Sequence, residues 1–324
     1  MKKLSFSLLL LVSLLAGGSL AAEYPNRPIE IIVPFPPGGS TDPAFRVIQP
    51  GLQAALGVPV VLTTKAGAAG ALGTEFVAKA KPDGYTLLAG TNSSLIVAPA
   101  VNPSITYQHS DFIPACIFAT DAAGIISKLN TPWRNLGELL DYARKNPGKL
   151  SYGATGMGTV SFFTMEIFKL SNDLDIVPVQ FQGTGPVKNA ILGGHVDLAS
   201  ATLSPFYPLF KAKQLTLLVT TAPRRMPDFP DVPTMAEKGM GEGALGMWSG
   251  IFVPKRCPPE VVEKINKAMD KVMQDPRVEA QLSQLGFFIE YRKTQDTLNQ
   301  IDREGVVVDR VVKKLGMGKD SPPK

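Results

Sequence analysis

The sequence is poor in the residues that most often carry catalysis or hold metals. Its 324 residues include two histidines, His109 and His195, and two cysteines, Cys116 and Cys257. It has no Gly-x-Ser-x-Gly nucleophile motif, no His-Glu-x-x-His zinc motif and no Cys-x-x-Cys pair. We interpret both histidines as surface or loop residues. Because catalysis needs a positioned base or nucleophile, the sequence predicts a protein that is not an enzyme and holds no metal and no cofactor.

Long apolar runs are confined to the N-terminus. Two lysines precede an almost wholly apolar stretch, residues 4–16, and small residues follow it. This order predicts a secretory signal peptide over residues 1–22, cleaved after Ala21 or Ala22. No cysteine stands there to receive a lipid, and no later run is long enough to span a bilayer. We expect a soluble, exported protein, and we infer a periplasmic location.

A strong excess of one charge is also absent. Lys and Arg number 33 and Asp and Glu 28, interspersed, for a net charge of +5. This distribution favours neither a nucleic-acid partner nor a membrane-binding cluster, so we expect no nucleic acid to bind. Export would permit a disulfide between Cys116 and Cys257, but their separation in the sequence leaves that pairing open.

The most informative stretch lies at residues 29–46. An apolar β-branched run at 29–33 predicts a strand, and a Pro- and Gly-rich loop then leads to Asp42, Pro43 and a helix. We expect Asp42 to be the N-cap and Pro43 to take the first helical position. A glycine-rich loop at a helix N-terminus is a favourable place for an anion such as a carboxylate. The same arrangement also occurs in α/β proteins that bind nothing there.

Strands and helices alternate along most of the chain. Similar loops rich in Gly and hydroxyl groups recur at residues 90–94, 154–161 and 182–186, each after a predicted strand. In parallel sheets ligands bind beyond the carboxyl ends of the strands, so these loops are candidates for one site. The economical interpretation is two similar α/β lobes.

Three further expectations concern helices. Pro50-Gly51 should kink or break the first helix, and Gly57 should end it. Pro258-Pro259 and Asp275-Pro276 each predict a helix start. A last helix is predicted over residues 294–315, with Gly316 as its stop.

Six motifs, taken in order, resemble one protein family, the Bug proteins, which are extracytoplasmic solute receptors of tripartite tricarboxylate transporters. The motifs lie at residues 34–42, 65–74, 81–85, 146–153, 192–198 and 231–234. The resemblance implies a periplasmic-binding-protein-like α/β fold in which two lobes close on an organic anion. Two crossover segments, near residues 116–120 and 248–253, would join lobe 1 (residues 23–118 and 252–324) to lobe 2 (residues 119–251).

The resemblance also implies a function and a site. The protein would capture a small organic carboxylate in the periplasm and deliver it to membrane transporter subunits, acting as a monomer. The acid would be held by loops of both lobes, partly through waters, with Asp42 shaping the loop rather than contacting the anion. The implied ligand-binding residues are Phe35, Gly38, Gly39, Ser40, Thr41, Asp42, Ser93, Ser94, Thr155, Gly156, Gly158, Thr159, Phe162, Gln182, Gly183, Thr184 and Thr202.

Departures from the family pattern bear on the ligand. Phe162 replaces a His found in many relatives, Ser94-Leu95 replaces a Thr-His pair, and Gln180-Phe181 replaces a Pro-Tyr pair. Fewer hydrogen bonds and more apolar area favour a ligand with one carboxylate and a hydrophobic or aromatic body. The alternatives are a periplasmic sensor that feeds a signalling partner, an exported enzyme on a similar frame, and a receptor that no longer binds.

Overall fold

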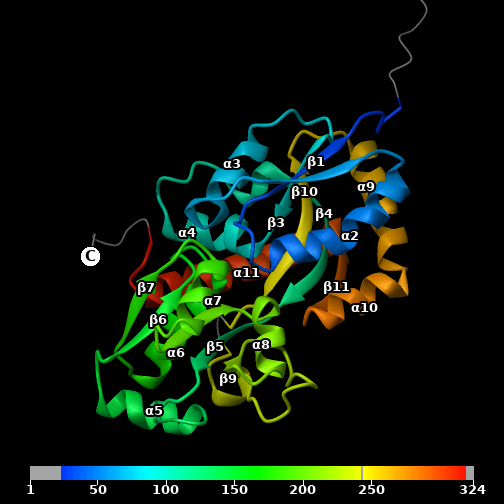
Figure 1. The fold of residues 1–324 in the computed structure, drawn as a ribbon. Helices are drawn as coiled ribbons and strands as arrows, with labels where there is room; N and C mark the ends of the chain where they lie inside the picture. The colour runs from blue at the N-terminus through cyan, green and yellow to red at the C-terminus, as the bar shows by residue number, and fades with distance from the viewer. Residues whose placement is uncertain (1–22, 242–243, 319–324) are drawn as a thin grey trace, which may run out of the picture.

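The computed structural model describes residues 23–241 and 244–318, which form two lobes, each built around one β-sheet (Figure 1). The predicted signal peptide at 1–22 lies outside the described residues. The first sheet has six strands in the order β11-β4-β10-β3-β1-β2, and the second has five in the order β7-β6-β8-β5-β9. This confirms the two-lobed α/β architecture that the alternating strands and helices predict.

Three parallel strands form one half of the first sheet, where β1 pairs with both β2 and β3. The antiparallel pair β4 and β10 continues the sheet, and β11 closes its other edge. The strands are β1 (Ile29–Val33), β2 (Val60–Thr64), β3 (Thr86–Gly90), β4 (Phe112–Asp121), β10 (Met247–Pro254) and β11 (Phe288–Lys293). The helices between them are α2 (Thr41–Leu56), η1 (Ala68–Gly70), α3 (Ala71–Ala78), η2 (Ser93–Val97), α4 (Ala98–Val101) and η3 (His109–Asp111).

The second sheet repeats this plan. Its β6 pairs in parallel with β7 and β8, and β5 runs antiparallel to β8 and β9. The strands are β5 (Ala123–Lys128), β6 (Leu150–Ala154), β7 (Ile176–Gln180), β8 (Leu198–Thr202) and β9 (Leu215–Thr220). Its helices are α5 (Leu136–Lys145), α6 (Val160–Asn172), α7 (Thr184–Leu192), η4 (Ser204–Phe206), α8 (Tyr207–Lys211) and η5 (Ala236–Lys238).

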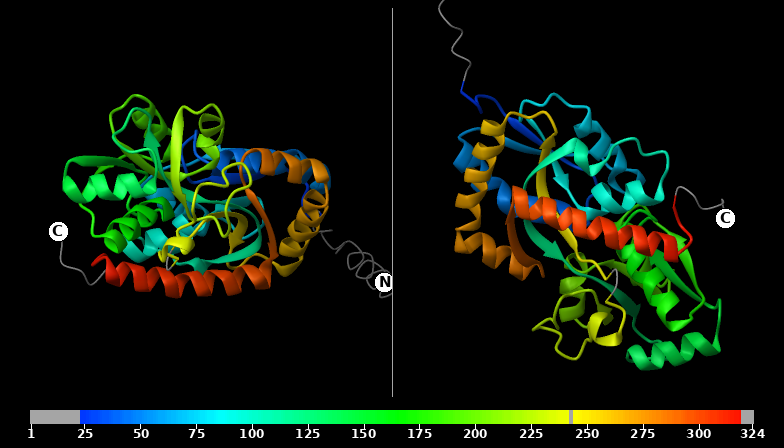
Figure 2. Two further views of the ribbon diagram at one scale, coloured as in Figure 1. Left: turned by 90° about the horizontal axis from the view of Figure 1, so that it is seen from below. Right: turned by 180° about the vertical axis from the view of Figure 1, so that it is seen from behind.

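Three C-terminal helices return to the first lobe: α9 (Pro259–Met273), α10 (Pro276–Gln284) and α11 (Thr294–Lys314). Helix α9 packs against α2 and β4, and α11 contacts β4, η2 and α4. Figure 2 shows α11 running along the back of the molecule, from the first lobe toward the second. The predicted starts of α9 and α10 are confirmed, as is the end of α11, where Gly316 adopts a left-handed conformation with φ 62°.

The passages between the sheets are the neighbouring strands β4 and β10. Residues 116–120 and 248–253, the expected crossovers, lie within these strands and pair with each other in the first sheet. Only Ala122 separates the end of β4 in the first sheet from the start of β5 in the second. The strands that lead into the second lobe and out of it are therefore held together by a ladder of backbone hydrogen bonds.

Two expectations about α2 are wrong, namely that Asp42 is its N-cap and that Pro50-Gly51 breaks it. Its N-cap is Ser40, so Pro43 is the third helical residue, and the Asp42 carboxylate pairs with Arg46 at 2.7 Å instead of capping the helix. The helix also continues through Pro50-Gly51 to Leu56. Tertiary packing outweighs the lost hydrogen bond there, because the apolar face of α2 is buried against α9. The helix end at Gly57, with φ 73°, is confirmed.

Gly51 lets α9 approach α2 closely. A Cβ atom at Gly51 would lie 3.0 Å from Val272 Cγ2, whereas one at Gly305 of α11 would meet nothing within 4 Å. We expect Gly51→Leu to lower the free energy of unfolding by about 1–3 kcal/mol through overpacking. Gly305→Leu should instead raise it slightly, because leucine favours helix more than glycine does. Urea unfolding of both variants checks this, and equal effects would contradict the packing assigned to Gly51.

Candidate functional site

A small pocket lined by hydroxyl groups lies where loops of the two lobes meet; we call it the inner pocket. Its volume is about 30 Å³, enough for a water molecule or one small polar group. The first lobe contributes the loop after β1 and Ser93, and the second contributes the residues that follow β6, β7 and β8. The lining residues are Phe35, Pro36, Gly39, Ser40, Thr41, Ser93, Thr155, Thr159, Ser161, Gly183, Thr184, Thr202 and Met247.

Three helices begin at the inner pocket. Helix α2 begins at Thr41, α6 has Thr159 as its N-cap, and α7 begins at Thr184. Free backbone N–H groups at a helix start carry partial positive charge, so three converging starts form a site suited to an anion. Pro43 and Pro186, the third residues of α2 and α7, have no N–H to contribute. The remaining polar groups that line the pocket are hydroxyls.

The two lobes touch directly at this pocket. Ser40 Oγ donates to Thr202 Oγ1 at 3.1 Å, and the backbone N–H of Val160 donates to Ser93 Oγ at 3.2 Å. Glycine is required at the contact. Gly183 has φ 100°, and a Cβ there would lie 2.9 Å from Pro36 Cγ of the opposite lobe. The two lobes are therefore in contact at the inner pocket, held by one hydroxyl-to-hydroxyl bond and one backbone-to-hydroxyl bond between them.

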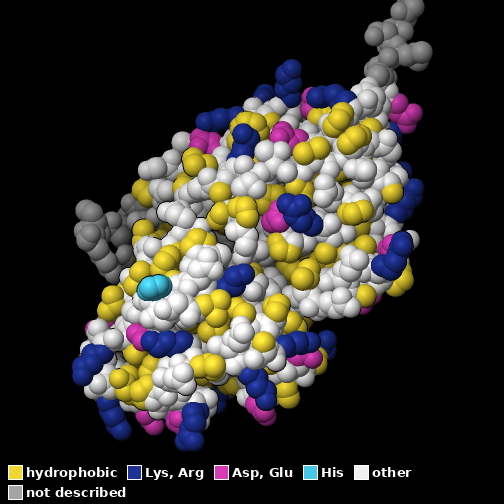
Figure 3. Space-filling model, in the orientation of Figure 1, with side chains coloured by type: hydrophobic (Ala, Val, Ile, Leu, Met, Phe, Trp, Pro, Cys, Tyr) yellow, Lys and Arg dark blue, Asp and Glu magenta, His cyan; other side chains and the backbone are white. Residues whose placement is uncertain are grey.

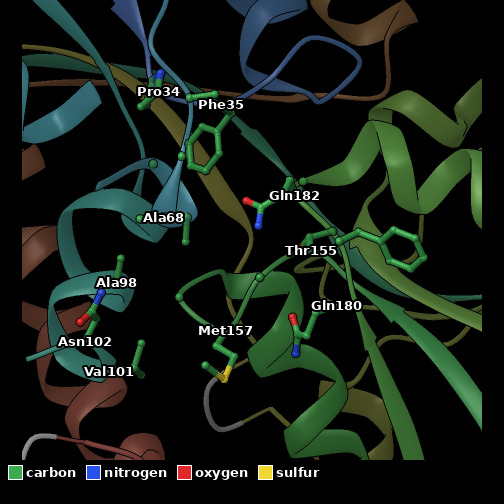
Figure 4. Close-up of a pocket in the computed structure, with 18 of the residues that line it drawn as sticks. Pro34, Phe35, Ala68, Ala98, Val101, Asn102, Thr155, Met157, Gln180 and Gln182 are labelled. Carbon is green, nitrogen blue, oxygen red and sulfur yellow. The ribbon is translucent and has the colours of Figure 1, made fainter. Parts of the chain in front are cut away.

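A larger cavity of about 700 Å³ adjoins the inner pocket; we call it the outer cavity (Figure 4). Both are lined by Phe35, Pro36, Thr155 and Gly183. Most of the wall is apolar, and among the residues that the structure describes no charged side chain lines either space. The further lining residues of the outer cavity are Pro34, Ala66, Gly67, Ala68, Ala69, Gly70, Ala98, Val101, Asn102, Ile105, Gly156, Met157, Gly158, Gln180, Phe181, Gln182 and Met317.

Side chains from both lobes face each other in the outer cavity. In Figure 4 the Phe35 ring and Ala68 lie on one side, and Gln182 extends its amide toward them from the other. Met157 lies at the far end from Phe35, with 57% of its surface exposed. The polar side chains on this wall are Gln180, Gln182, Asn102 and Thr155, all neutral. The cavity therefore offers hydrogen bonds but no counter-charge.

One buried acid lies close to the inner pocket. Asp121, at the end of β4, is fully buried and accepts hydrogen bonds from Ser204 Oγ at 2.6 Å and from the backbone N–H groups of Leu203 and Ser204. Burial raises the pKa of Asp121 to about 7, against the opposing effect of these donors and of the Ser40 hydroxyl. Asp121 thus joins the first sheet to the start of η4 in the second lobe, beside Ser40.

Most of the residues implied by the family resemblance come together here. The inner pocket and outer cavity are lined by the predicted Phe35, Gly39, Ser40, Thr41, Ser93, Thr155, Gly156, Gly158, Thr159, Gln182, Gly183, Thr184 and Thr202.

Four predicted residues line neither space. The Asp42 carboxylate pairs with Arg46, and the Ser94 side chain bonds to Thr91. Phe162 is 5% exposed and belongs to the hydrophobic core. Gly38 instead lies against Gly185 of the opposite lobe.

Sequence reasoning missed a large part of the apolar wall. The small-residue motif at 65–74 supported the family resemblance, yet its use as a wall of the cavity was not predicted. Residues 98–105, which follow η2, carry no ligand signal in the sequence. The π-helix η2 begins at Ser93, within the stretch where the sequence predicts a polar loop. Met317, beyond the last helix, has no local pattern that would place it at a site.

A family model matches residues 44–317, nearly all of the described chain, and its description is tripartite tricarboxylate transporter family receptor, TctC. The chain belongs to the TctC family. This confirms the resemblance to Bug proteins: BugT of Bordetella pertussis is 33% identical over 260 residues, covering 80% of each chain. As a TctC receptor, the chain is a solute-binding protein of a transport system.

Solved structures agree with the fold. The periplasmic binding protein BugD has a TM-score of 0.85 at 29% identity, with 91% of this chain and 99% of that chain covered. Rpa4515 of R. palustris, with adipate, has a TM-score of 0.86 at 26% identity, covering 91% and 99%. MatC from Rhodopseudomonas palustris, with bound malate, has a TM-score of 0.83 at 28% identity, covering 89% and 100%. The periplasmic-binding-protein fold of this TctC receptor is thereby confirmed.

Other features can be stated for residues 23–241 and 244–318. No helix there has the length and apolarity needed to cross a membrane, and no group of three or more His, Cys, Asp or Glu side chains is placed to hold a metal. Cys116 and Cys257 are both free and buried, so they do not form the disulfide that the sequence left open. On the face seen in Figure 3, basic and acidic side chains are scattered among each other.

The raised pKa of Asp121 makes stability depend on pH. Between the unfolded value of 3.8 and the folded value of about 7, the folded state holds a proton that the unfolded state has lost. Stability from this group is therefore lost as pH rises through that range, by on the order of 4 kcal/mol. We expect Asp121→Asn to remove this loss. The free energy of unfolding of the variant, measured with urea, should therefore rise relative to that of the wild type between pH 4.5 and 8. Parallel pH profiles would contradict the assignment.

Proposed function

We propose that this TctC receptor captures a small organic acid in the periplasm and delivers it to membrane transporter subunits. The acid would have one carboxylate and a hydrophobic or aromatic body. The single observation that carries the proposal is the junction of two unlike spaces. An inner pocket built from helix starts and hydroxyl groups adjoins an apolar outer cavity without charge, and the two share four lining residues.

The carboxylate would be bound in the inner pocket. Serine and threonine hydroxyls from both lobes and the free N–H groups of α2, α6 and α7 can donate hydrogen bonds to it, directly or through a water. In the closed cleft these hydroxyls bond to one another, as Ser40 does to Thr202. A carboxylate would exchange those neutral bonds for charge-assisted ones, which are stronger.

The hydrophobic body would occupy the outer cavity. A second carboxylate there would lose hydration and meet only neutral amides and apolar side chains, which makes its burial costly. This supports a preference for one carboxylate over two. The adipate and malate in Rpa4515 and MatC support carboxylates as the ligand class.

Binding without turnover is part of the proposal. Neither histidine lines the inner pocket or the outer cavity, and the side chains there are neutral hydroxyls, amides and apolar groups. None of these lining side chains is an activated nucleophile or a general base, and Asp121 lies behind Ser40 outside both spaces. The acid would therefore leave the receptor unchanged, as delivery to a transporter requires.

Calorimetric titration with a panel of acids tests the proposal. We expect benzoate and phenylpropionate to bind more tightly than malate or citrate, and bound phenylpropionate to be recovered unchanged. Thr202→Val should weaken binding about tenfold, because it removes a hydroxyl from the inner pocket.

Thr216→Val, the same change on β9 outside both spaces, is the matched control and should bind like the wild type. Preferential binding of citrate, or turnover of a bound acid, would contradict the proposal. Equal affinities of the two threonine variants would contradict the placement of the carboxylate.

A further inference from the structure

The end of α11 is fixed by a defined helix-stop motif. Gly316, in the left-handed conformation, donates its N–H to Lys313 O at 3.1 Å, and Met317 donates its N–H to Val312 O at 2.9 Å. These two bonds form a Schellman motif, which reverses the chain and holds the residue after the glycine in place. The backbone of Met317 is thus tied to the last turn of α11.

This stop places Met317 at the outer cavity. Met317 lines the cavity together with Val101, Asn102 and Ile105, and packs on the hydrophobic core. The next residue, Gly318, lies so close to α11 that a Cβ there would be 2.9 Å from Val312 Cγ1. The chain can follow this path because Gly316 adopts a left-handed φ of 62° and because Gly318 has no side chain to meet Val312.

The C-terminal segment is a third contributor to a cavity otherwise built by the two lobes. Met157 contributes a second flexible thioether from the other lobe. Methionine side chains adapt their shape and make favourable contacts with aromatic rings. A wall with two methionine side chains is therefore better suited to an apolar ligand body of variable shape than to a rigid polar ligand.

We propose that Met317 is a specificity-determining residue that contacts the part of the ligand body farthest from the carboxylate. The proposal rests on the proposed function, because it takes the carboxylate to lie in the inner pocket. A short acid would fill the space near Phe35 and leave Met317 untouched. A longer acid would extend through the outer cavity and bury its end against the thioether.

Titration of full-length variants with straight-chain monocarboxylates tests this. Met317→Ala should weaken octanoate binding about tenfold while leaving propionate within about twofold of the wild type. Met317→Leu, which keeps the volume, should retain octanoate affinity. Val306→Ala is the matched control: Val306 lies on α11, the helix that Met317 follows, is 60% exposed and is outside the cavity, so this variant should match the wild type for every acid.

A second variant should shift the ligand preference toward an acid with a second carboxylate. Met317→Lys would place a cation at the far end of the cavity, so adipate affinity should rise relative to octanoate. Equal losses for short and long acids in Met317→Ala, or an unchanged adipate-to-octanoate ratio in Met317→Lys, would overturn the inference and leave Met317 a packing residue. Failure of the wild type to bind any of the acids would instead overturn the proposed function, and this inference with it.

Discussion

The structure depends on bringing the starts of three helices, from two lobes, to one small pocket. Each start carries only a partial positive charge, and none would hold an anion firmly by itself. Their convergence requires the lobes to touch, and the contact between Gly183 and Pro36 tolerates no larger side chain. The hydrogen bonds from Ser40 to Thr202 and from Val160 to Ser93 complete the contact. Glycine and hydroxyl residues at the loops are thus a requirement of lobe closure as well as of anion binding.

A neutral cradle of this kind suits a receptor that must release its ligand. A buried salt bridge would bind an acid through one strong attraction but would leave an uncompensated charge when the ligand departs. Several neutral donors, each contributing a modest hydrogen bond, can bind the same acid. When the lobes separate, each donor can bond again to a neighbouring hydroxyl or to water. Asp121 sits at the base of this arrangement, where the chain passes from one sheet to the other. Its raised pKa reduces the negative charge beside a pocket proposed to accept an anion.

Much of the fold was predictable because its signals are local. β-branched runs predict most of the strands. Proline predicts the starts of α9 and α10, and glycine predicts the C-terminal ends of α2 and α11. The errors arose where tertiary contacts prevailed: Asp42 pairs with Arg46, and α2 continues through Pro50 because α9 covers its apolar face. The strand β11 and the helix η2 were not predicted, since they depend on pairing with β4 and packing on α11. The hydroxyl loops of the site carried a sequence signal, whereas the apolar wall consists of ordinary small and aliphatic residues.

Helix α11 links the two parts of the site. The Glu304 carboxylate accepts hydrogen bonds from Asn92 Nδ2 and Trp248 Nε1, both at 3.0 Å, which ties the helix to the start of η2 and to β10. Asn92 directly precedes Ser93, the hydroxyl that reaches across the cleft to Val160. About three turns beyond Glu304, the same helix ends in the motif that positions Met317. A shift of α11 along its axis would therefore move the inner-pocket hydroxyl and the far wall of the outer cavity together, so the position of the C-terminal helix bears on both closure and ligand size.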